Sequence, residues 1–236
     1  MMIHSVLLSK IEGITHAFLN HQESIRFVAK GGYISIKQIH SSDVWVCDDN
    51  ISPEHSKKIQ ADAIVCHSED KTISIITADC IPLIIASSDA EIISVVHAGW
   101  KGLAQGIIKN TLTEIQKLNV SQSELFFCIG PHILPCCYEI KEDLIQSIKE
   151  TSSNQCDITP FSEVRDNGSR YLSLARWCHH LLTEEGVSPS NIESISQCTY
   201  CSAYGYGSYR RRAHREEAKS FQYSWIKKRP AVRKFG

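Results

Sequence analysis

Residues 73–98 read ISIITADCIPLIIASSDAEIISVVHA. Three apolar runs in this stretch, residues 73–77, 82–86 and 92–97, have the length and the β-branched composition of strands. The connection between the last two runs is short and polar, which predicts a hairpin. Antiparallel pairing is therefore expected, and a purely parallel sheet is not.

Further elements extend this pattern on both sides. Additional strands are expected at residues 33–40, 43–47, 63–66, 125–129 and 192–197. After Gly99 and Gly102, apolar residues at helical spacing predict helices at residues 103–118, 139–149 and 172–182. The polar residues 151–169 are expected to form a loop. With no repeat or linker in view, the prediction is a single α+β domain over residues 1–236, with mixed sheets flanked by helices.

The composition limits the possible partners. Of 236 residues, 25 are basic and 26 acidic, so the formal charge is −1 and no field of one sign exists to attract nucleic acid or an anionic membrane. The apolar runs are too short to span a bilayer, and the N-terminus lacks the apolar core of a signal peptide. Ten cysteines in a chain without an export signal are expected to be reduced thiols, so we expect a cytoplasmic protein.

Three segments contain side chains that suit a metal. They are Gln38-Ile39-His40, the stretch from Thr77 to Pro82 with Cys80, and the stretch from His97 to Gly102. Two imidazoles and one thiolate suit zinc, and three ligands leave a fourth position for water or substrate. Such a metal would lower the pKa of a bound water toward about 7. Forty residues separate His40 from Cys80, so the spacing alone does not show that the ligands converge.

These segments, in this order, resemble the multicopper polyphenol oxidase or laccase-domain family, whose members are purine nucleoside phosphorylase-like zinc enzymes. The family carries Gln-x-His, Thr-x-Asp-Cys-x-Pro and His-Ala-Gly-Trp-[Arg/Lys]-Gly motifs, which match here at residues 38–40, 77–82 and 97–102. Further matches lie at residues 61–63, 129–131, 137–139, 198–200 and 208–211, so the resemblance covers roughly the whole chain. Residues 132–136 and 212–217 depart from the family pattern.

The resemblance implies a function and a set of site residues. It implies a cysteine-hydrolase-like fold and a metal, Zn²⁺ in preference to Cu²⁺, on His40, Cys80 and His97. It also implies phosphorolysis of adenosine, inosine or methylthioadenosine and deamination of adenosine, with small-molecule nucleosides and phosphate as partners. We assign Asp79, Cys80 and Arg210 to catalysis. Residues expected to bind substrate or phosphate are Gln38, Gly99, Trp100, Lys101, Gly102, Tyr209, Arg210 and Arg211.

Structural interpretations of the same residues remain open. Residues 99–102 can form a turn with a packed Trp100 and a solvated Lys101, and an arginine run is often a charged surface loop. Asp79 can cap a turn instead of accepting a proton, and Asp62 can do the same.

The remaining cysteines and histidines are expected to be structural. Cys198 and Cys201 form one C-x-x-C pair without a second pair, which argues against a structural zinc site. Adjacent Cys136 and Cys137 are poorly placed to bond to each other, and Cys137 and Cys198 are expected to lie in the core or line the pocket. His132, His179 and His180 are expected to be packing or surface residues.

Other functions compete with the nucleoside enzyme. Copper-dependent oxidation of phenols needs many clustered histidines, whereas the 11 here include no His-x-His pair. Cys80 could also act as the nucleophile of a hydrolase that acts on cell-wall precursors, a role linked to some family members. A metal-binding or partner-binding module without turnover is a further alternative, and the oligomeric state stays open.

Overall fold

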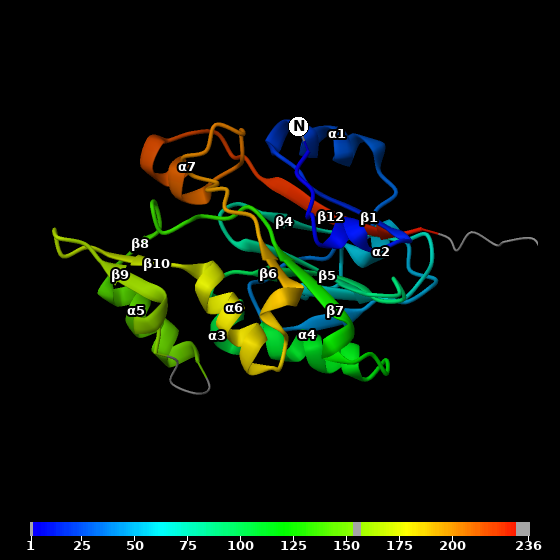
Figure 1. Cartoon of the computed structure of the whole chain (residues 1–236). Helices are drawn as coiled ribbons and strands as arrows, with labels where there is room; N and C mark the ends of the chain where they lie inside the picture. Colours follow the sequence, from blue (N-terminus) through cyan, green and yellow to red (C-terminus); the bar gives the residue numbers. More distant parts are fainter. Residues whose placement is uncertain (1, 153–156, 230–236) are drawn as a thin grey trace, which may run out of the picture.

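The computed structural model describes residues 2–152 and 157–229, and its centre is a six-stranded mixed sheet in the order β11-β7-β5-β6-β3-β2 (Figure 1). β5 pairs antiparallel with both β6 and β7, so the predicted hairpin is confirmed. Parallel pairing occurs between β2 and β3 and between β7 and β11. The strands of this sheet are β2 (Val44–Val46), β3 (Ala63–Cys66), β5 (Ile81–Ser87), β6 (Ile93–Ala98), β7 (Leu125–Ile129) and β11 (Ile192–Ser194).

Both faces of the central sheet are buried, which explains its nearly continuous apolar strands. On β5, Leu83 and Ile85 point into one core, whereas Ile84 and Ala86 point into the other. This alternation follows from the two-residue period of a strand. The resulting molecule has three layers, with helices below the central sheet and a second sheet above it (Figure 1).

The upper layer is an antiparallel sheet in the order β1-β12-β4. It joins segments from the beginning, the middle and the end of the described chain, because β12 pairs with both other strands. The helix α1 (His21–Lys30) follows β1 and begins with a capping box between Asn20 and Glu23. The three strands and the short helix beside them are β1 (Ile14–Phe18), β4 (Thr72–Thr77), β12 (Gln222–Lys228) and α2 (Pro53–Ser56).

The lower layer packs α3, α4 and α6 on the central sheet, with Trp177 and Phe127 fully buried between them. The single helix predicted at residues 103–118 is divided at Gly106, which adopts a left-handed conformation with φ of 90°. The remaining elements are α3 (Trp100–Gln105), α4 (Ile107–Gln116), β8 (Glu139–Ile140), α5 (Glu142–Thr151), β9 (Ser162–Val164), β10 (Arg170–Leu172), α6 (Leu174–Glu184) and α7 (Tyr209–Arg215).

Two other predictions of local structure are wrong. Residues 33–40 form isolated bridges from Ile34 to Ile73 and from Lys37 to Gln60, because the segment crosses between partners instead of running beside one strand. Residues 151–169 were expected to be a loop, but they contain a 3-10 helix at Thr159–Phe161 and the strand β9. The expected loop residues 153–156 lie outside the described part of the chain.

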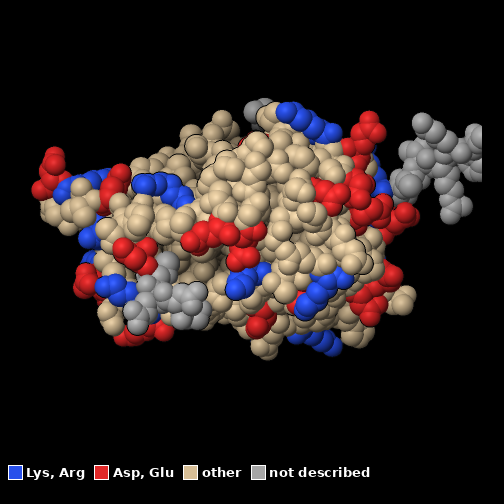
Figure 2. All heavy atoms as spheres, turned by 60° about the horizontal axis from the view of Figure 1, so that its bottom comes forward, with Lys and Arg blue, Asp and Glu red and all other residues tan. Residues whose placement is uncertain are grey.

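The surface agrees with the balanced charge of the sequence. On the face that carries the helical layer, the acidic and basic side chains of the described residues are interspersed and form no continuous basic field (Figure 2). Within the described residues, no helix is both long enough and apolar enough to cross a bilayer.

The buried His16 on β1 makes stability depend on pH. Burial and the nearby His4 lower the pKa of His16 from 6.5 to about 4, and its Nε2 accepts a hydrogen bond from the amide of Ser5. Between these two pKa values the unfolded chain binds a proton that the folded chain does not, so stability falls as the pH falls.

We therefore expect the free energy of unfolding to decrease by up to about 1.4 kcal/mol per pH unit below pH 6.5 through His16. Urea unfolding at several pH values between 4 and 7 would measure this slope. His16→Gln should reduce the slope, whereas substitution of the exposed His67 by Gln should not. An identical slope in parent and His16→Gln would contradict the assignment.

Candidate metal centre

The structure brings together the three side chains proposed as metal ligands. The ligand atoms of His40, Cys80 and His97 all lie within 4.8 Å of one another. The two imidazole rings meet edge to face, with their centroids 4.8 Å apart. The convergence that the sequence spacing did not show is therefore a property of the fold.

The β5–β6 hairpin places two of these ligands. Pro82 on β5 is paired with His97 on β6, so Cys80 just before β5 lies beside Gly99 just after β6. A Cβ atom on Gly99 would lie 2.8 Å from the sulfur of Cys80, which is too close. Gly99 is therefore required here for close approach to the thiol, a structural role beside the substrate contact expected for it.

Asp62 connects the third ligand, His40, to His97 on the β5–β6 hairpin. Its fully buried carboxylate accepts hydrogen bonds from the amides of Ile39, His40 and Ser41 at 3.2, 3.1 and 2.6 Å. The same carboxylate contacts Nδ1 of His97 at 2.7 Å. His40 has a φ of 59°, and these amide bonds hold its backbone in that uncommon conformation.

Asp62 was not among the predicted site residues. The signal that could have identified it is the carboxylate in the family match at residues 61–63, directly before a strand that is otherwise apolar. A carboxylate bonded to one nitrogen of a ligating histidine leaves the other nitrogen for the metal and fixes the orientation of the ring. Asp62 has this position relative to His97.

Neighbouring charges shift the pKa values of Cys80 and His97. Burial alone would raise the pKa of Cys80, but the charges and hydrogen bonds of His97 and His40 outweigh burial and lower it to about 6. Burial alone would lower the pKa of His97, but the Cys80 thiolate and Asp62 raise it to about 9. The site therefore favours a thiolate, the form of cysteine that binds a metal.

The donor set fits a catalytic zinc ion. Zinc binds imidazole nitrogen at about 2.0–2.1 Å and thiolate sulfur at about 2.3 Å, and three protein ligands leave a fourth position open. His97 is buried and Cys80 is half-buried, whereas His40 is exposed, so the group is accessible from one side. The residues present therefore fit the metal that the resemblance implies.

Asp79, which was predicted to take part in catalysis, makes structural hydrogen bonds through both of its carboxylate oxygens. Its Oδ1 accepts a bond of 2.6 Å from the hydroxyl of Thr199. Its Oδ2 accepts bonds from the hydroxyl of Ser208 at 2.9 Å and from the amide of Arg210 at 2.7 Å. With φ of 87°, Asp79 turns the chain before Cys80 and caps the start of α7. The geometry favours the capping interpretation over a role as proton acceptor.

Two residues expected to bind substrate make structural hydrogen bonds. The side-chain amide of Gln38 exchanges two hydrogen bonds with the backbone of Ile76, at 2.7 and 2.8 Å. The guanidinium of Arg211 bonds Glu217 and three backbone carbonyl oxygens, which occupies four of its five N–H donors. Arg211 therefore holds the loop before α7 together.

Arg210 lies against Tyr138. Its guanidinium is 5.3 Å from the centre of the Tyr138 ring, and its Nη1 donates to the carbonyl of Glu139. The backbone amide of Arg210 donates to Asp79, the chain neighbour of Cys80. Arg210 is half-buried and keeps further N–H donors that these contacts do not use.

The other predicted substrate residues also make structural contacts. Trp100 packs against the helical core, and the exposed Lys101 lies 5.5 Å from its ring, as the structural interpretation of this turn predicts. A Cβ on Gly102 would lie 3.0 Å from the carbonyl oxygen of Ser41, so Gly102 also serves close packing. Tyr209 is 62% exposed and stacks with Arg212.

Two surface hollows lie elsewhere on the described chain. One, of about 490 Å³, lies over α6 and is lined by Phe161, His179 and His180 among others. Another, of about 350 Å³, lies beside Cys201 and Arg211. The lining of these two hollows does not include His40, Cys80 or His97.

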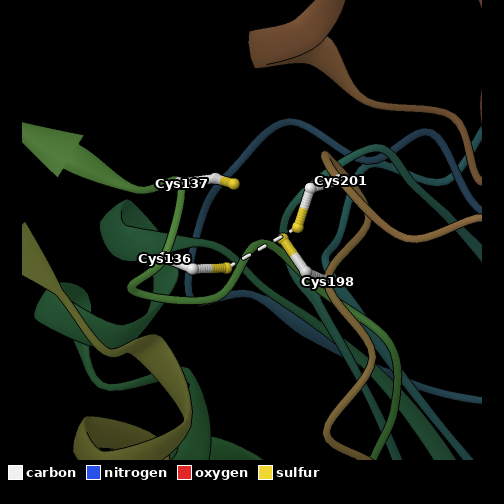
Figure 3. A group of neighbouring side chains, drawn as sticks. All are labelled: Cys136, Cys137, Cys198 and Cys201. Atoms are coloured by element: carbon white, nitrogen blue, oxygen red, sulfur yellow. Dashed lines mark hydrogen bonds between the residues drawn. The ribbon is translucent and has the colours of Figure 1, made fainter.

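The prediction that Cys198 and Cys201 lack a second pair is wrong. The structure brings Cys136 and Cys137 to them, and all four sulfur atoms lie within 4.8 Å of one another (Figure 3). The prediction failed because 61 residues separate Cys137 from Cys198, so the pairs meet only in the fold. His132 is buried, as expected for a packing residue.

We expect Asp62→Asn to weaken zinc binding by about 10- to 100-fold, the usual effect of removing a carboxylate that orients a ligating histidine. An amide offers its NH₂ to groups that are already donors, so both His97 and the turn at His40 lose support. Competition with a chelating dye would measure the dissociation constant. Asn at the exposed Asp43 is the matched control, and equal affinities in both variants would exclude this role of Asp62.

Comparisons with known proteins found relatives in sequence and in fold. A purine nucleoside phosphorylase of Clostridium acetobutylicum is 29% identical over 182 residues, covering 76% of this chain and 70% of that protein. Adenosine deaminase RL5, from an unknown prokaryotic organism, is 27% identical over 180 residues, covering 74% and 68%. The solved structure of the hypothetical protein YfiH from Bacillus licheniformis has the same fold, with a TM-score of 0.79, 19% identity and 96% coverage of both chains.

The family model described as multi-copper polyphenol oxidoreductase laccase matches residues 15–226. The match begins in β1 and ends in β12, so it includes the central sheet, the three candidate ligands and the loop that Asp79 anchors. The chain belongs to the multi-copper polyphenol oxidoreductase laccase family.

Proposed function

We propose that the protein is a zinc-dependent purine nucleoside phosphorylase with adenosine deaminase activity, acting on adenosine, inosine or methylthioadenosine. The observation that carries the proposal is the open set of His40, Cys80 and His97, oriented by Asp62. Relatives named purine nucleoside phosphorylase and adenosine deaminase support the two activities.

Two net reactions have to be served by one site. In phosphorolysis a phosphate oxygen bonds to C1′ of the ribose, the bond from C1′ to the base nitrogen breaks, and the base leaves with the electron pair and takes up a proton. In deamination the oxygen of water bonds to the purine carbon, and ammonia leaves. When bound, zinc would supply Lewis acidity for activating an oxygen nucleophile.

Some residues would hold the metal ligands in place, and others would bind the substrate. Asp62 fixes His97 and the turn at His40, so the ligand geometry is set before substrate arrives. Arg210 lies next to Tyr138 at the edge of the site and offers forked donors suited to phosphate. Asp79 holds the start of the helix that carries Arg210 through the amide of that residue.

Two other activities compete with this proposal. The family description suggests oxidation of phenols by several coppers. Among the described residues, however, the other group able to hold a metal consists of cysteines alone, which does not suit a cluster of Cu²⁺ ions. A hydrolase of cell-wall precursors with Cys80 as nucleophile would require a free thiolate, so it predicts activity that chelators do not inhibit.

Cys80→Ala should abolish both nucleoside activities and remove the zinc of this site, because the substitution deletes its one thiolate. Adenosine incubated with and without phosphate would report adenine and inosine formation by chromatography. Cys178→Ala is the matched control, since that thiol is buried on α6 and belongs to neither group of candidate metal ligands. Retention of either activity by Cys80→Ala would argue against one shared metal centre.

Arg210→Gln should raise KM for phosphate at least about 10-fold, the loss expected for one charge-assisted contact, and leave deamination of adenosine within about 2-fold. Arg212→Gln changes the same charge two positions along the same helix and should alter neither. A parallel loss of both reactions in Arg210→Gln would indicate that the residue supports the fold of the site instead of binding phosphate.

A further inference from the structure

Four thiols that are separate from the group of His40, Cys80 and His97 meet between two loops. Cys136 and Cys137 lie in the loop between β7 and β8, and Cys198 and Cys201 lie in the loop between β11 and α7. Their sulfur atoms point toward a common space between the two loops (Figure 3). Cys198 is buried, Cys137 is half-buried, and the other two are exposed.

The two loops are held against each other by backbone contacts. His132 and Cys198 form a parallel bridge, in which the amide of Thr199 donates to the carbonyl of His132 at 3.0 Å. The amide of Leu134 donates to the sulfur of Cys198 at 3.5 Å. The thiols are therefore brought together by the fold itself, so a ligand that they bind would meet a largely preformed site.

The spacing of the sulfur atoms suits a metal. With metal–sulfur bonds of about 2.3 Å, the sulfur atoms of a tetrahedral zinc site lie about 3.8 Å apart. The sulfur atoms of Cys136 and Cys201 are 3.7 Å apart, and all four lie within 4.8 Å of one another. A disulfide would instead require about 2.05 Å. The spacing of the four thiols is therefore compatible with one tetrahedral zinc ion.

The surroundings suit the charge of such a site. Four thiolates around a divalent cation carry a net charge of −2, which nearby cations offset. Arg165 donates to the carbonyl of Pro135, next to Cys136, at 3.0 Å. Arg211 donates to the carbonyls of Thr199 and Tyr200, between the other two cysteines, at 2.7 and 2.8 Å. Each of the two loops that carry the cysteines therefore has a guanidinium hydrogen-bonded to its backbone.

We propose that Cys136, Cys137, Cys198 and Cys201 bind a second zinc ion as a closed structural site. Four thiolates are the ligand set of structural zinc, and they leave no open position for substrate. The site would clamp the two loops that border the metal centre, because Thr199 between Cys198 and Cys201 donates its hydroxyl to Asp79, the neighbour of Cys80. This inference does not depend on the proposed nucleoside activity.

Metal content of the purified full chain tests the proposal. The parent should hold two zinc ions per chain, while Cys201→Ser and Cys80→Ala should each hold one and their combination none. Cys178→Ala, a thiol outside both groups, should keep two. A parent with one zinc ion that is lost in Cys80→Ala and kept in Cys201→Ser would overturn the proposal.

Cobalt substitution tests the same site without altering its cysteines. In the Cys80→Ala chain, Co²⁺ should give the intense near-ultraviolet charge-transfer bands and the visible bands of a tetrahedral tetrathiolate, and excess Zn²⁺ should remove them. This measurement stands even if Cys201→Ser fails to fold. Absence of these bands, iron in place of zinc, or a Cys136–Cys201 disulfide detected by non-reducing mass spectrometry of the parent would contradict a structural zinc site.

Discussion

The buried carboxylate of Asp62 is the constraint on which the metal centre depends. A fully buried carboxylate is costly unless its oxygens are hydrogen-bonded. Here it accepts from three consecutive amides at residues 39–41, from the hydroxyl of Ser41 and from His97. The same contacts that compensate for burial also join the turn of His40 to the strand of His97. Removing the carboxylate would therefore affect the fold and the ligand geometry together.

The central sheet supplies the rigid frame for this arrangement. Because helices cover one face and the β1-β12-β4 sheet covers the other, β5 and β6 are buried on both faces and have little freedom to move. Their hairpin register pairs Pro82 with His97 and brings Cys80 beside Gly99, two residues after His97. The metal ligands lie at the ends of these strands, where the chain leaves the packed core and side chains become accessible.

A second buried carboxylate organises the other border of the site. Asp79 binds Thr199, Ser208 and the amide of Arg210, so one residue next to a metal ligand holds both the C-x-x-C loop and the beginning of α7. Arg211 then ties that loop to itself through three carbonyls. The position of Arg210 near Tyr138 is a consequence of these contacts. The proposed zinc site at the four cysteines would strengthen the same border.

Local pattern in the sequence was sufficient for the hairpin of β5 and β6, for the strand β7 and for the α+β class, because apolar periodicity and a short polar turn act over a few residues. Motifs were sufficient to nominate His40, Cys80 and His97. The strand at residues 33–40 and the unbroken helix at residues 103–118 were wrong, since pairing partners and the left-handed Gly106 are not evident from periodicity. Only the tertiary structure decided that Asp62 orients the ligands, that Gln38 and Arg211 are committed to the backbone, and that Cys136 and Cys137 meet Cys198 and Cys201. Each of these results joins residues far apart in the chain, and such contacts arise from packing that no local pattern encodes.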